Sequence, residues 1–218
     1  MRILFSFTIR KCLLMSLSKY NQKRDFEQTR EPKGKVDKSQ NELIFVVQKH
    51  AASHLHYDFR LELNGVLLSW AVPKGPSTDP EVKRLAMMVE DHPYSYKDFE
   101  GTIPEGNYGA GNVIVWDNGT YVPAEKTSSA EKTLKEHLKK GHLSFILNGK
   151  KLKGEFALVK MNGKQENAWL LMKKDDQFAS DVDILQKNKS VISNVTLEEL
   201  EEKSESKTAA SEKKKTPK

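Results

Sequence analysis

The sequence predicts a mainly β fold, an antiparallel β-barrel with short flanking helices and disordered termini. Short runs of alternating apolar and polar residues recur between about residues 42 and 173. Four Asn-Gly pairs accompany these runs, beginning at residues 64, 118, 148 and 162. Asn-Gly supplies the two positive-φ residues of a tight hairpin turn. A series of hairpins indicates an antiparallel meander, and closure into a barrel would leave no unpaired strand edge.

The chain divides into a central domain and two polar ends. Its 218 residues suit one domain with tails. Residues 1–40 lack sustained periodicity and are predicted to form a mobile N-terminal arm, part of which could pack on the domain. Residues 41–175 carry the strand patterns and form the predicted barrel domain. Residues 176–218 are rich in Lys and Glu, which predicts a polar, disordered tail.

The predicted elements follow one another along residues 41–175. The strands outside the central hairpin, each an apolar or β-branched run, are expected at residues 42–49, 85–91, 113–116, 120–122, 142–147, 155–160 and 168–173. Asn118-Gly119 and Asn148-Gly149 are the expected turns of two further hairpins. Leu134 and Leu138, four apart in a lysine-rich stretch, predict an amphipathic helix over 128–140. Residues 93–112 form a long glycine-bearing loop, and long loops in compact domains are often functional.

The clearest hairpin runs from residue 55 to residue 72. Apolar and ionisable residues alternate strictly over 55–63, so one strand face suits a core and the other suits polar chemistry. Asn64-Gly65 then predicts a type I′ turn. The register that this turn sets on the apolar face pairs Leu63 with Val66, Leu61 with Leu68, Phe59 with Trp70, and Tyr57 with Val72.

The other face of this hairpin carries charged groups beside small residues. The same register places Arg60 opposite Ser69 and Asp58 opposite Ala71. An ordinary solvated strand face would more often carry Lys, Glu or Thr at the opposing positions. We therefore expect this face to be the floor of a pocket.

Two histidines and an aspartate form a candidate metal-binding group. His56 and Asp58 share one strand face with Cα atoms roughly 7 Å apart, and His50 stands just upstream. Two imidazoles and a carboxylate suit Mn²⁺, Fe²⁺ or Zn²⁺ with positions left for water or substrate. The alternative is a surface strand with incidental histidines, and spacing alone does not decide between the two.

The composition limits the partners and the compartment. A formal net charge of +6 favours a polyanionic partner, although a solvated basic surface would give the same value. The single cysteine, Cys12, excludes an internal disulfide and fits a reducing cytoplasm. No apolar run reaches the length of a membrane-spanning helix, so we expect no membrane partner.

Two stretches carry a resemblance to a known family, QKHAASHLHYDFRLELNGVLLSWAVPKGPS and KRLAMMVEDHPYSYKDFEGTIPEGNYGAGNVIVWDNGTY. Together they closely resemble the 3′-phosphoesterase domain of bacterial and archaeal DNA ligase D. The likeness is dense over residues 42–121 and extends more loosely to about residue 174. A long match with several parts is more specific than any short motif.

The resemblance implies roles for individual residues. His50, His56 and Asp58 would be the metal ligands, with Mn²⁺ as the expected ion, although ligand type alone does not exclude Zn²⁺ or Fe²⁺. The implied catalytic residues are Arg60, Arg84, His92 and Tyr96, and the implied substrate contacts are Arg60, Lys74, Arg84 and Tyr96.

Some of these residues have a structural alternative. The Arg60 guanidinium could fork onto a phosphate, or form a structural ion pair with Asp58 or Glu62. His92 could bond a phosphate oxygen or protonate the leaving oxygen, or it could mark a strand-end turn. Tyr96 could be a buried core ring instead of an active-site group.

The resemblance also implies a function. The chain would be a stand-alone, metal-dependent DNA 3′-end-healing phosphoesterase that removes a 3′-terminal ribonucleoside and then the 3′-phosphate. This would leave a 3′-OH for ligation in DNA break repair. The expected partners are primer-template 3′ ends, with or without a terminal ribonucleotide, and a separate DNA ligase and end-binding protein, since no Lys-x-Asp-Gly ligase motif occurs here. We expect a cytoplasmic, nucleoid-associated protein.

Two other functions stay open from the residues alone. His-x-Asp on a barrel strand with a distal His also fits a non-haem Fe(II) oxygenase. The basic residues Arg60, Lys74 and Arg84 favour a phosphate over a single organic acid. The second alternative is a non-catalytic DNA-end-binding module with a structural metal, against which the intact histidines and aspartate argue.

Overall fold

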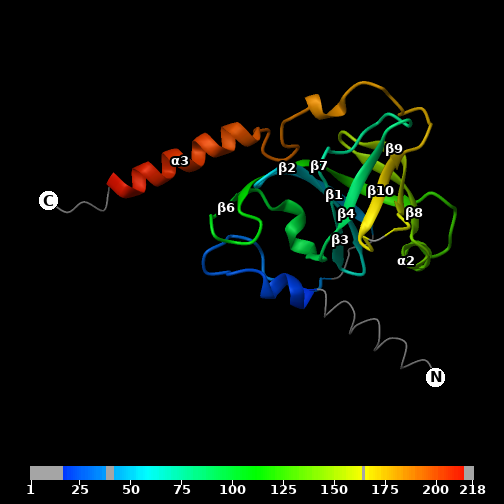
Figure 1. Cartoon of the computed structure of the whole chain (residues 1–218), viewed down its shortest axis with the longest axis horizontal. Helices are drawn as coiled ribbons and strands as arrows, with labels where there is room; N and C mark the ends of the chain where they lie inside the picture. Colours follow the sequence, from blue (N-terminus) through cyan, green and yellow to red (C-terminus); the bar gives the residue numbers. More distant parts are fainter. Residues whose placement is uncertain (1–16, 38–41, 164, 214–218) are drawn as a thin grey trace.

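The structure is a computed structural model and describes residues 17–37, 42–163 and 165–213. The strands of its main sheet, in spatial order, are β1 (Ile44–Ala51), β2 (Leu55–Leu63), β3 (Val66–Val72), β4 (Lys83–Met88), β10 (Ala168–Lys173), β9 (Lys153–Lys160), β8 (His142–Gly149) and β7 (Gly111–Pro123) (Figure 1). Because β7 also pairs with β1, these eight antiparallel strands close into a barrel. The predicted fold class is confirmed.

Short elements flank the barrel. The short strands are β5 (His92–Pro93), which pairs with β3, and β6 (Gly101–Ile103), which pairs with β7. The helical elements are α2 (Ala130–Lys140), α3 (Leu197–Lys213), the 3₁₀ helices η1 (Tyr94–Asp98) and η2 (Ile184–Gln186), and residues 17–22. Helix α2 matches the amphipathic helix expected over 128–140 and buries Leu134. In the described parts of the chain, no helix is both long and apolar enough to cross a membrane.

The barrel interior is a packed apolar core. Its largest fully buried rings are Phe45, Phe59, Trp70, Trp116, Phe145 and Phe156. The rings of Trp70 and Trp169 meet edge to face with centroids 5.9 Å apart, a geometry that adds to the burial of their area. Apolar side chains of β2 and β3 belong to this core, so the polar side chains that alternate with them face the outer wall.

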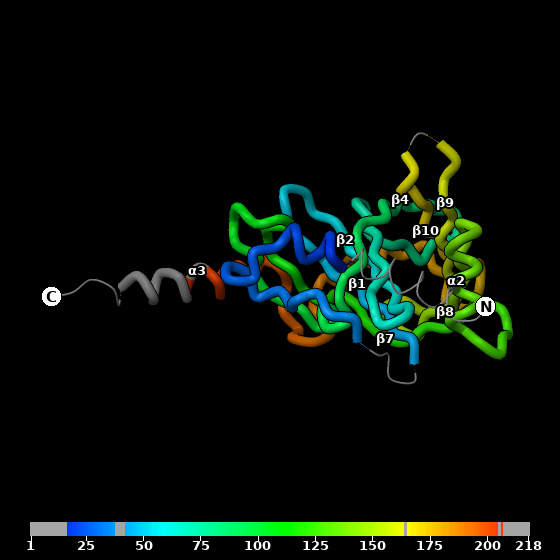
Figure 2. The backbone as a smooth tube through the Cα atoms, turned by 90° about the horizontal axis from the view of Figure 1, so that it is seen from below, coloured from blue at the N-terminus to red at the C-terminus, as the bar shows by residue number. Residues whose placement is uncertain are grey.

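A second apolar cluster covers part of that outer wall. It joins the N-terminal segment to the barrel through Tyr20, Val46, Leu67, Tyr96, Phe99, Ile103, Val113 and Val115. Figures 1 and 2 show the blue N-terminal segment running along the same side of the molecule as the green loops around β6. Segments from elsewhere in the chain thus cover the polar residues of β1 and β2.

The register of the β2–β3 hairpin agrees with the prediction. Tyr57 pairs with Val72, Phe59 with Trp70, and Asp58 with Ala71. The turn has the expected backbone, since φ is 57° at Asn64 and 77° at Gly65. A two-residue type I′ turn fixes which residues face each other, and this register decides which side chains reach the outer wall.

Two of the predicted hairpin turns are wrong. Asn118-Gly119 lies inside the continuous strand β7, where Gly119 pairs with both Phe45 and Gly149. A Cβ at Gly119 would lie 2.2 Å from the carbonyl oxygen of Asn148. This glycine therefore permits a close approach of β8 and does not make a turn.

The turn expected at Asn148-Gly149 is displaced. Strand β8 continues through Gly149, and the chain reverses over the next residues. There the Asp117 carboxylate accepts the backbone N–H groups of Lys150, Lys151 and Leu152 at 2.8–3.0 Å. A side chain that is distant in the sequence therefore accepts the backbone hydrogen bonds of this turn. The local sequence does not reveal this interaction.

The described part of the N-terminal end belongs to the folded body. Residues 17–37 were expected to be part of a mobile arm outside a domain starting at residue 41, but they lie on the barrel wall with Tyr20 fully buried. The reason is that a few buried side chains anchor a segment whose average composition is polar. Residues 1–16, which carry the remainder of that expectation and include Cys12, lie outside the described residues.

The described part of the C-terminal end is also structured. Ile184 joins the barrel core, and the backbone oxygen of Lys187 accepts a 2.7 Å hydrogen bond from Trp116 Nε1. Helix α3 then extends away from the barrel (Figure 1). The domain boundary expected between residues 175 and 176 therefore falls within a packed segment. Residues 214–218 lie outside the described part.

Candidate active site

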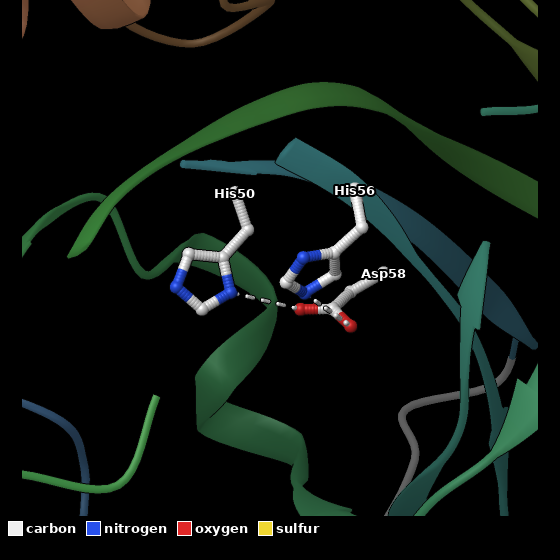
Figure 3. Close-up of side chains that lie close together, drawn as sticks. All are labelled: His50, His56 and Asp58. Carbon is white, nitrogen blue, oxygen red and sulfur yellow. Dashed lines mark ion pairs between the residues drawn. The ribbon is translucent and has the colours of Figure 1, made fainter. Parts of the chain in front are cut away.

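Strands β1 and β2 bring the predicted ligand group together. In the register His50 lies opposite His56 and Gln48 opposite Asp58, so all four side chains share the outer face. Nδ1 of His50 lies 3.6 Å from one Asp58 oxygen, and Nε2 of His56 lies 3.7 Å from the other. Figure 3 shows both imidazoles turned toward the carboxylate. The three ligand atoms lie within 4.8 Å of one another, which fits coordination of one ion.

Backbone hydrogen bonds orient both histidines for that role. Nε2 of His50 lies 2.9 Å from the carbonyl oxygen of Gly109 and therefore donates to it, which leaves Nδ1 free to bind a metal. Nδ1 of His56 donates in the same way to the carbonyl oxygen of His54 at 2.9 Å, which leaves Nε2 free. The free nitrogens are those that face Asp58. Carbonyl partners of this kind fix the tautomer of metal-binding histidines, so the site fits a divalent transition metal.

Arg60 is held rigidly behind the ligand group. Its side chain is 2% exposed, and it donates to Gln48 Oε1 at 2.8 Å, Ser69 Oγ at 2.8 Å and Asp58 Oδ2 at 3.0 Å. Burial alone would raise the pKa of Asp58, but the Arg60 guanidinium and the histidines His50 and His56 lower it well below its usual value. Asp58 is therefore anionic at neutral pH, as a metal ligand would have to be. Of the two roles considered for Arg60, the ion pair with Asp58 is present in this structure.

The N-terminal segment adds a second buried arginine. The Arg24 guanidinium is 3.7 Å from the centre of the Tyr20 ring and donates from Nε to Glu31 Oε1 at 2.9 Å. The same Glu31 oxygen accepts from the hydroxyl of Tyr96 at 2.9 Å. Burial, followed by the charge on Glu31, raises the pKa of Tyr96 well above its usual value, so this phenol stays protonated.

His92 is hydrogen-bonded to Arg24 and is neutral. Its Nδ1 lies 3.0 Å from the carbonyl oxygen of Glu90 and carries the proton, so Nε2 accepts from Arg24 Nη2 at 3.1 Å. Burial, together with the charges of Arg60 and Arg24, lowers its pKa well below the usual value. In the free site His92 is thus a hydrogen-bond acceptor.

These groups surround one cavity of about 250 Å³. Its walls include the ligand group, both buried arginines, Glu90, His92, Tyr96 and Tyr108. Ala71 forms part of the floor, as expected from its place opposite Asp58.

The structure does not bring Lys74 and Arg84 to this cavity. Lys74 is exposed just after β3, and neither residue lines the walls. Arg84 lies opposite Leu171 and on the same strand face as the fully buried Ala86, which turns it toward the barrel interior.

Several residues that line the cavity or support Arg60 behind it were not predicted from the sequence. Gln48 could have been found, because it precedes His50 by two residues and therefore shares its strand face. Arg24, Glu31 and Tyr108 have no such signal, since tertiary packing alone brings their segments to β1 and β2. Ser69 was noticed only as a small neighbour, whereas it accepts a hydrogen bond from Arg60.

Barrel and site together define a class of protein, an antiparallel barrel that presents a His-His-Asp group and buried arginines on its outer wall. The family described as the DNA ligase D 3′-phosphoesterase domain matches residues 48–160. The multifunctional non-homologous end joining protein LigD of Pseudomonas aeruginosa is 51% identical over 189 residues, which cover 83% of this chain and 22% of that protein. The LigD proteins of Mycobacterium tuberculosis and Mycolicibacterium smegmatis are 41% and 43% identical, over 78% and 74% of this chain and 21% of each relative.

The chain belongs to the DNA ligase D 3′-phosphoesterase domain family. It spans about a fifth of the length of these curated relatives. The predicted resemblance is confirmed.

Proposed function

We propose that this chain is a Mn²⁺-dependent 3′-phosphoesterase that acts on DNA 3′ ends in the cytoplasm, at the nucleoid. It would remove a 3′-terminal ribonucleoside by diester hydrolysis and then the remaining 3′-phosphate, so that a 3′-OH is left for ligation in break repair by non-homologous end joining. A DNA ligase and an end-binding protein are the proposed partners. The observation that carries the proposal is the His50, His56 and Asp58 group beside a buried arginine in an open cavity.

The donor set supports a divalent cation, with its two imidazoles and one carboxylate. His50, His56 and Asp58 would hold the ion, which when bound would supply Lewis-acid stabilisation of phosphoryl charge and an acidified water. Lys74 and Arg84 remain proposed phosphate contacts by family resemblance alone, because neither lines the cavity.

The buried arginines would bind the phosphate. Arg60 is fixed by three side-chain partners, so its guanidinium needs little reorganisation when negative charge develops nearby. A phosphate beside His92 would favour its protonated form. Protonated His92 would then donate to a phosphate oxygen or to the leaving 3′-oxygen. Tyr96, protonated and bonded to Glu31, would keep this wall of the site in place.

The direct test is release of inorganic phosphate from a primer-template with a 3′-phosphate, with and without Mn²⁺. We expect turnover that a chelator abolishes and Mn²⁺ restores. Oxygen uptake measured with Fe²⁺ and a 2-oxo acid serves as the control for the oxygenase alternative. Turnover without added metal after chelation, or no phosphate release at all, would contradict the proposal.

The proposed first step predicts dependence on a 2′-OH. Diester cleavage of a ribonucleoside-ended primer should exceed that of the all-deoxy primer about ten- to a hundredfold, since losing a hydrogen bond to a charged partner costs about 1.5–3 kcal/mol. A deoxyribonucleoside 3′-phosphate should remain a substrate, because monoester hydrolysis needs only the phosphate contacts. Equal cleavage of the first two primers would instead indicate a general 3′ exonuclease.

A further inference from the structure

One aromatic ring at the cavity is exposed to solvent, unlike the buried rings around it. Tyr108 is 48% exposed and lines the cavity wall. It precedes Gly109, whose carbonyl oxygen holds the His50 imidazole at 2.9 Å. The ring is therefore one residue away from the backbone atom that orients a proposed metal ligand.

The loop that carries Tyr108 is structured. Asn107 N–H donates to the carbonyl oxygen of Pro104 at 3.2 Å, and Ala110 N–H donates to that of Asn107 at 3.1 Å. Gly109 has a φ of 77°, a left-handed conformation that glycine adopts at no steric cost. Two consecutive turns thus present the ring at the rim of the cavity.

A cation accompanies this ring. The ammonium group of Lys23 lies 4.4 Å from the ring centre of Tyr108 and 3.3 Å from its hydroxyl oxygen. Lys23 also pairs with Glu90 at 3.0 Å, and its side chain is 41% exposed. The rim therefore presents a half-exposed aromatic ring, one face of which lies against a partly exposed positive charge.

The simplest alternative is that Tyr108 has only a structural role and holds the N-terminal segment against its own loop through the contact with Lys23. Such a structural contact would use the hydroxyl group and the ring face that Lys23 covers, and it would not require the ring to be half exposed. The buried tyrosines nearby follow that pattern, because Tyr20 and Tyr96 each use the hydroxyl on a fixed acceptor while the ring is covered. Stacking on a base, in contrast, requires an accessible ring face beside a backbone-binding cation.

We propose that Tyr108 stacks on the nucleobase of the 3′-terminal nucleotide, and that Lys23 contacts the DNA backbone phosphate on its 5′ side. This inference rests on the proposed function, since it assumes that the scissile phosphate lies at the His50, His56 and Asp58 group. Every base has a stackable face, so the contact is sequence-tolerant. It would let the site accept any terminal base while rejecting phosphate esters that lack one.

The test combines ring removal with base removal. Wild type, Tyr108→Ala and Tyr108→Phe are compared on two 3′-phosphate primer-templates, one with an ordinary terminal nucleotide and one whose terminal nucleotide lacks its base. Turnover in Mn²⁺ gives KM, and fluorescence anisotropy of the same DNAs gives Kd. Phe178→Ala is the matched control, because that ring is 43% exposed and does not line the cavity.

Stacking predicts a specific pattern. Tyr108→Ala should raise KM and Kd about five- to a hundredfold on the ordinary end, and it should leave both unchanged on the base-free end. Tyr108→Phe should stay within about twofold of wild type, since a phenyl ring still stacks. Tyr108→Leu replaces Tyr108→Ala if the melting temperature shows that the alanine variant is unfolded.

Two results would overturn the inference. One is an equal loss on both DNA ends, and the other is a Tyr108→Phe variant as impaired as Tyr108→Ala, which would assign the hydroxyl a fastening role. Absence of phosphate release by wild type would contradict the proposed function instead. The anisotropy comparison decides on stacking in that case as well, because it does not depend on turnover.

Discussion

Asp58 interacts with the two histidines on one side and with Arg60 on the other. It faces the two imidazoles as a candidate metal ligand, and it also neutralises the buried Arg60 guanidinium at 3.0 Å. Because its pKa is lowered in the folded state, the carboxylate contributes stability above the ordinary Asp range, and this contribution is lost as pH falls through and below that range. Substitutions at Asp58 therefore alter both metal binding and charge balance.

Asp58→Asn and Asp58→Ala separate these two roles. Both should abolish Mn²⁺-dependent turnover. The amide oxygen of the introduced asparagine still accepts from Arg60 but carries no charge, so Asp58→Asn should lose less stability than Asp58→Ala, which removes both the charge and the acceptor and should cost about 3–5 kcal/mol. Metal affinity by calorimetry and unfolding in urea measure the two effects, and normal Mn²⁺ affinity in either variant would refute the assignment of the ligand.

Glu62 is a buried acid on the same strand, away from the cavity. Its Oε1 accepts from the backbone N–H of Gly65 at 2.9 Å, and Oε2 has no hydrogen-bond partner among the described residues. Burial raises its pKa from 4.5 to about 7. A raised carboxyl pKa means that stability is fully present below pH 4.5 and is lost as pH rises through 7.

Glu62→Gln should therefore stabilise the protein in alkaline solution only. At pH 8 we expect a gain of about 1–3 kcal/mol, because the charged form of the wild-type residue is no longer buried. At pH 5 the two proteins should unfold alike. Urea unfolding across this range gives the comparison, with Glu105→Gln as an exposed control. A difference that does not vary with pH would show that Glu62 does not titrate in this range.

The ease of predicting each site residue follows from how it reaches the cavity. His50, His56, Asp58 and Arg60 were predictable because one hairpin turn and a period of two set their common face. Arg24 comes from a polar segment that packs on the barrel through a few buried side chains such as Tyr20. No local sequence pattern predicts this packing. The sequence thus predicted which side chains of β1 and β2 could form the site, but it did not predict which distant segments pack against them.

At the scale of elements, the same dipeptide serves three purposes in this chain. Asn64-Gly65 makes the predicted turn, Gly119 and Gly149 permit close approach between strands, and Asn162-Gly163 lies in the loop between β9 and β10. Sequence shows only the dipeptide, so the antiparallel barrel was predictable, but the positions of two turns and the continuity of β7 were not. The distinction depends on a neighbouring strand, and in the second case also on the Asp117 carboxylate.

Gly119→Ala tests the close approach. The new Cβ would lie 2.2 Å from the Asn148 carbonyl oxygen, so the strands must separate, and we expect a loss of about 1–3 kcal/mol. Gly163→Ala is the matched control, since no atom lies within 4 Å of its Cβ position. Urea unfolding should place the control within about 0.5 kcal/mol of wild type. Equal stability of both variants would contradict the packing of β7 on β8.

At the scale of the whole molecule, segments that precede and follow the barrel strands pack against the barrel. The N-terminal segment contributes Arg24 and Glu31 to the site. At the other end, Asp176 accepts from the backbone N–H of Glu155 at 2.7 Å and pairs with Lys173, and Ile184 enters the core. The folded unit is therefore larger than the strand pattern alone indicates.

Two truncations at the C-terminal end should give opposite results. Removing residues 176–218 deletes Ile184 and the acceptor of Trp116, and the loss of one such core side chain alone costs about 2–5 kcal/mol, so the melting temperature and turnover should both fall. Removing only residues 205–218 takes away charged chain beyond the buried Leu197. That variant should keep its melting temperature and its turnover at saturating DNA, while Kd for DNA rises less than about tenfold and depends less on salt. Thermal unfolding and anisotropy at two salt concentrations distinguish the pair. If the longer deletion left stability unchanged, residues 176–197 would have no part in holding the barrel together.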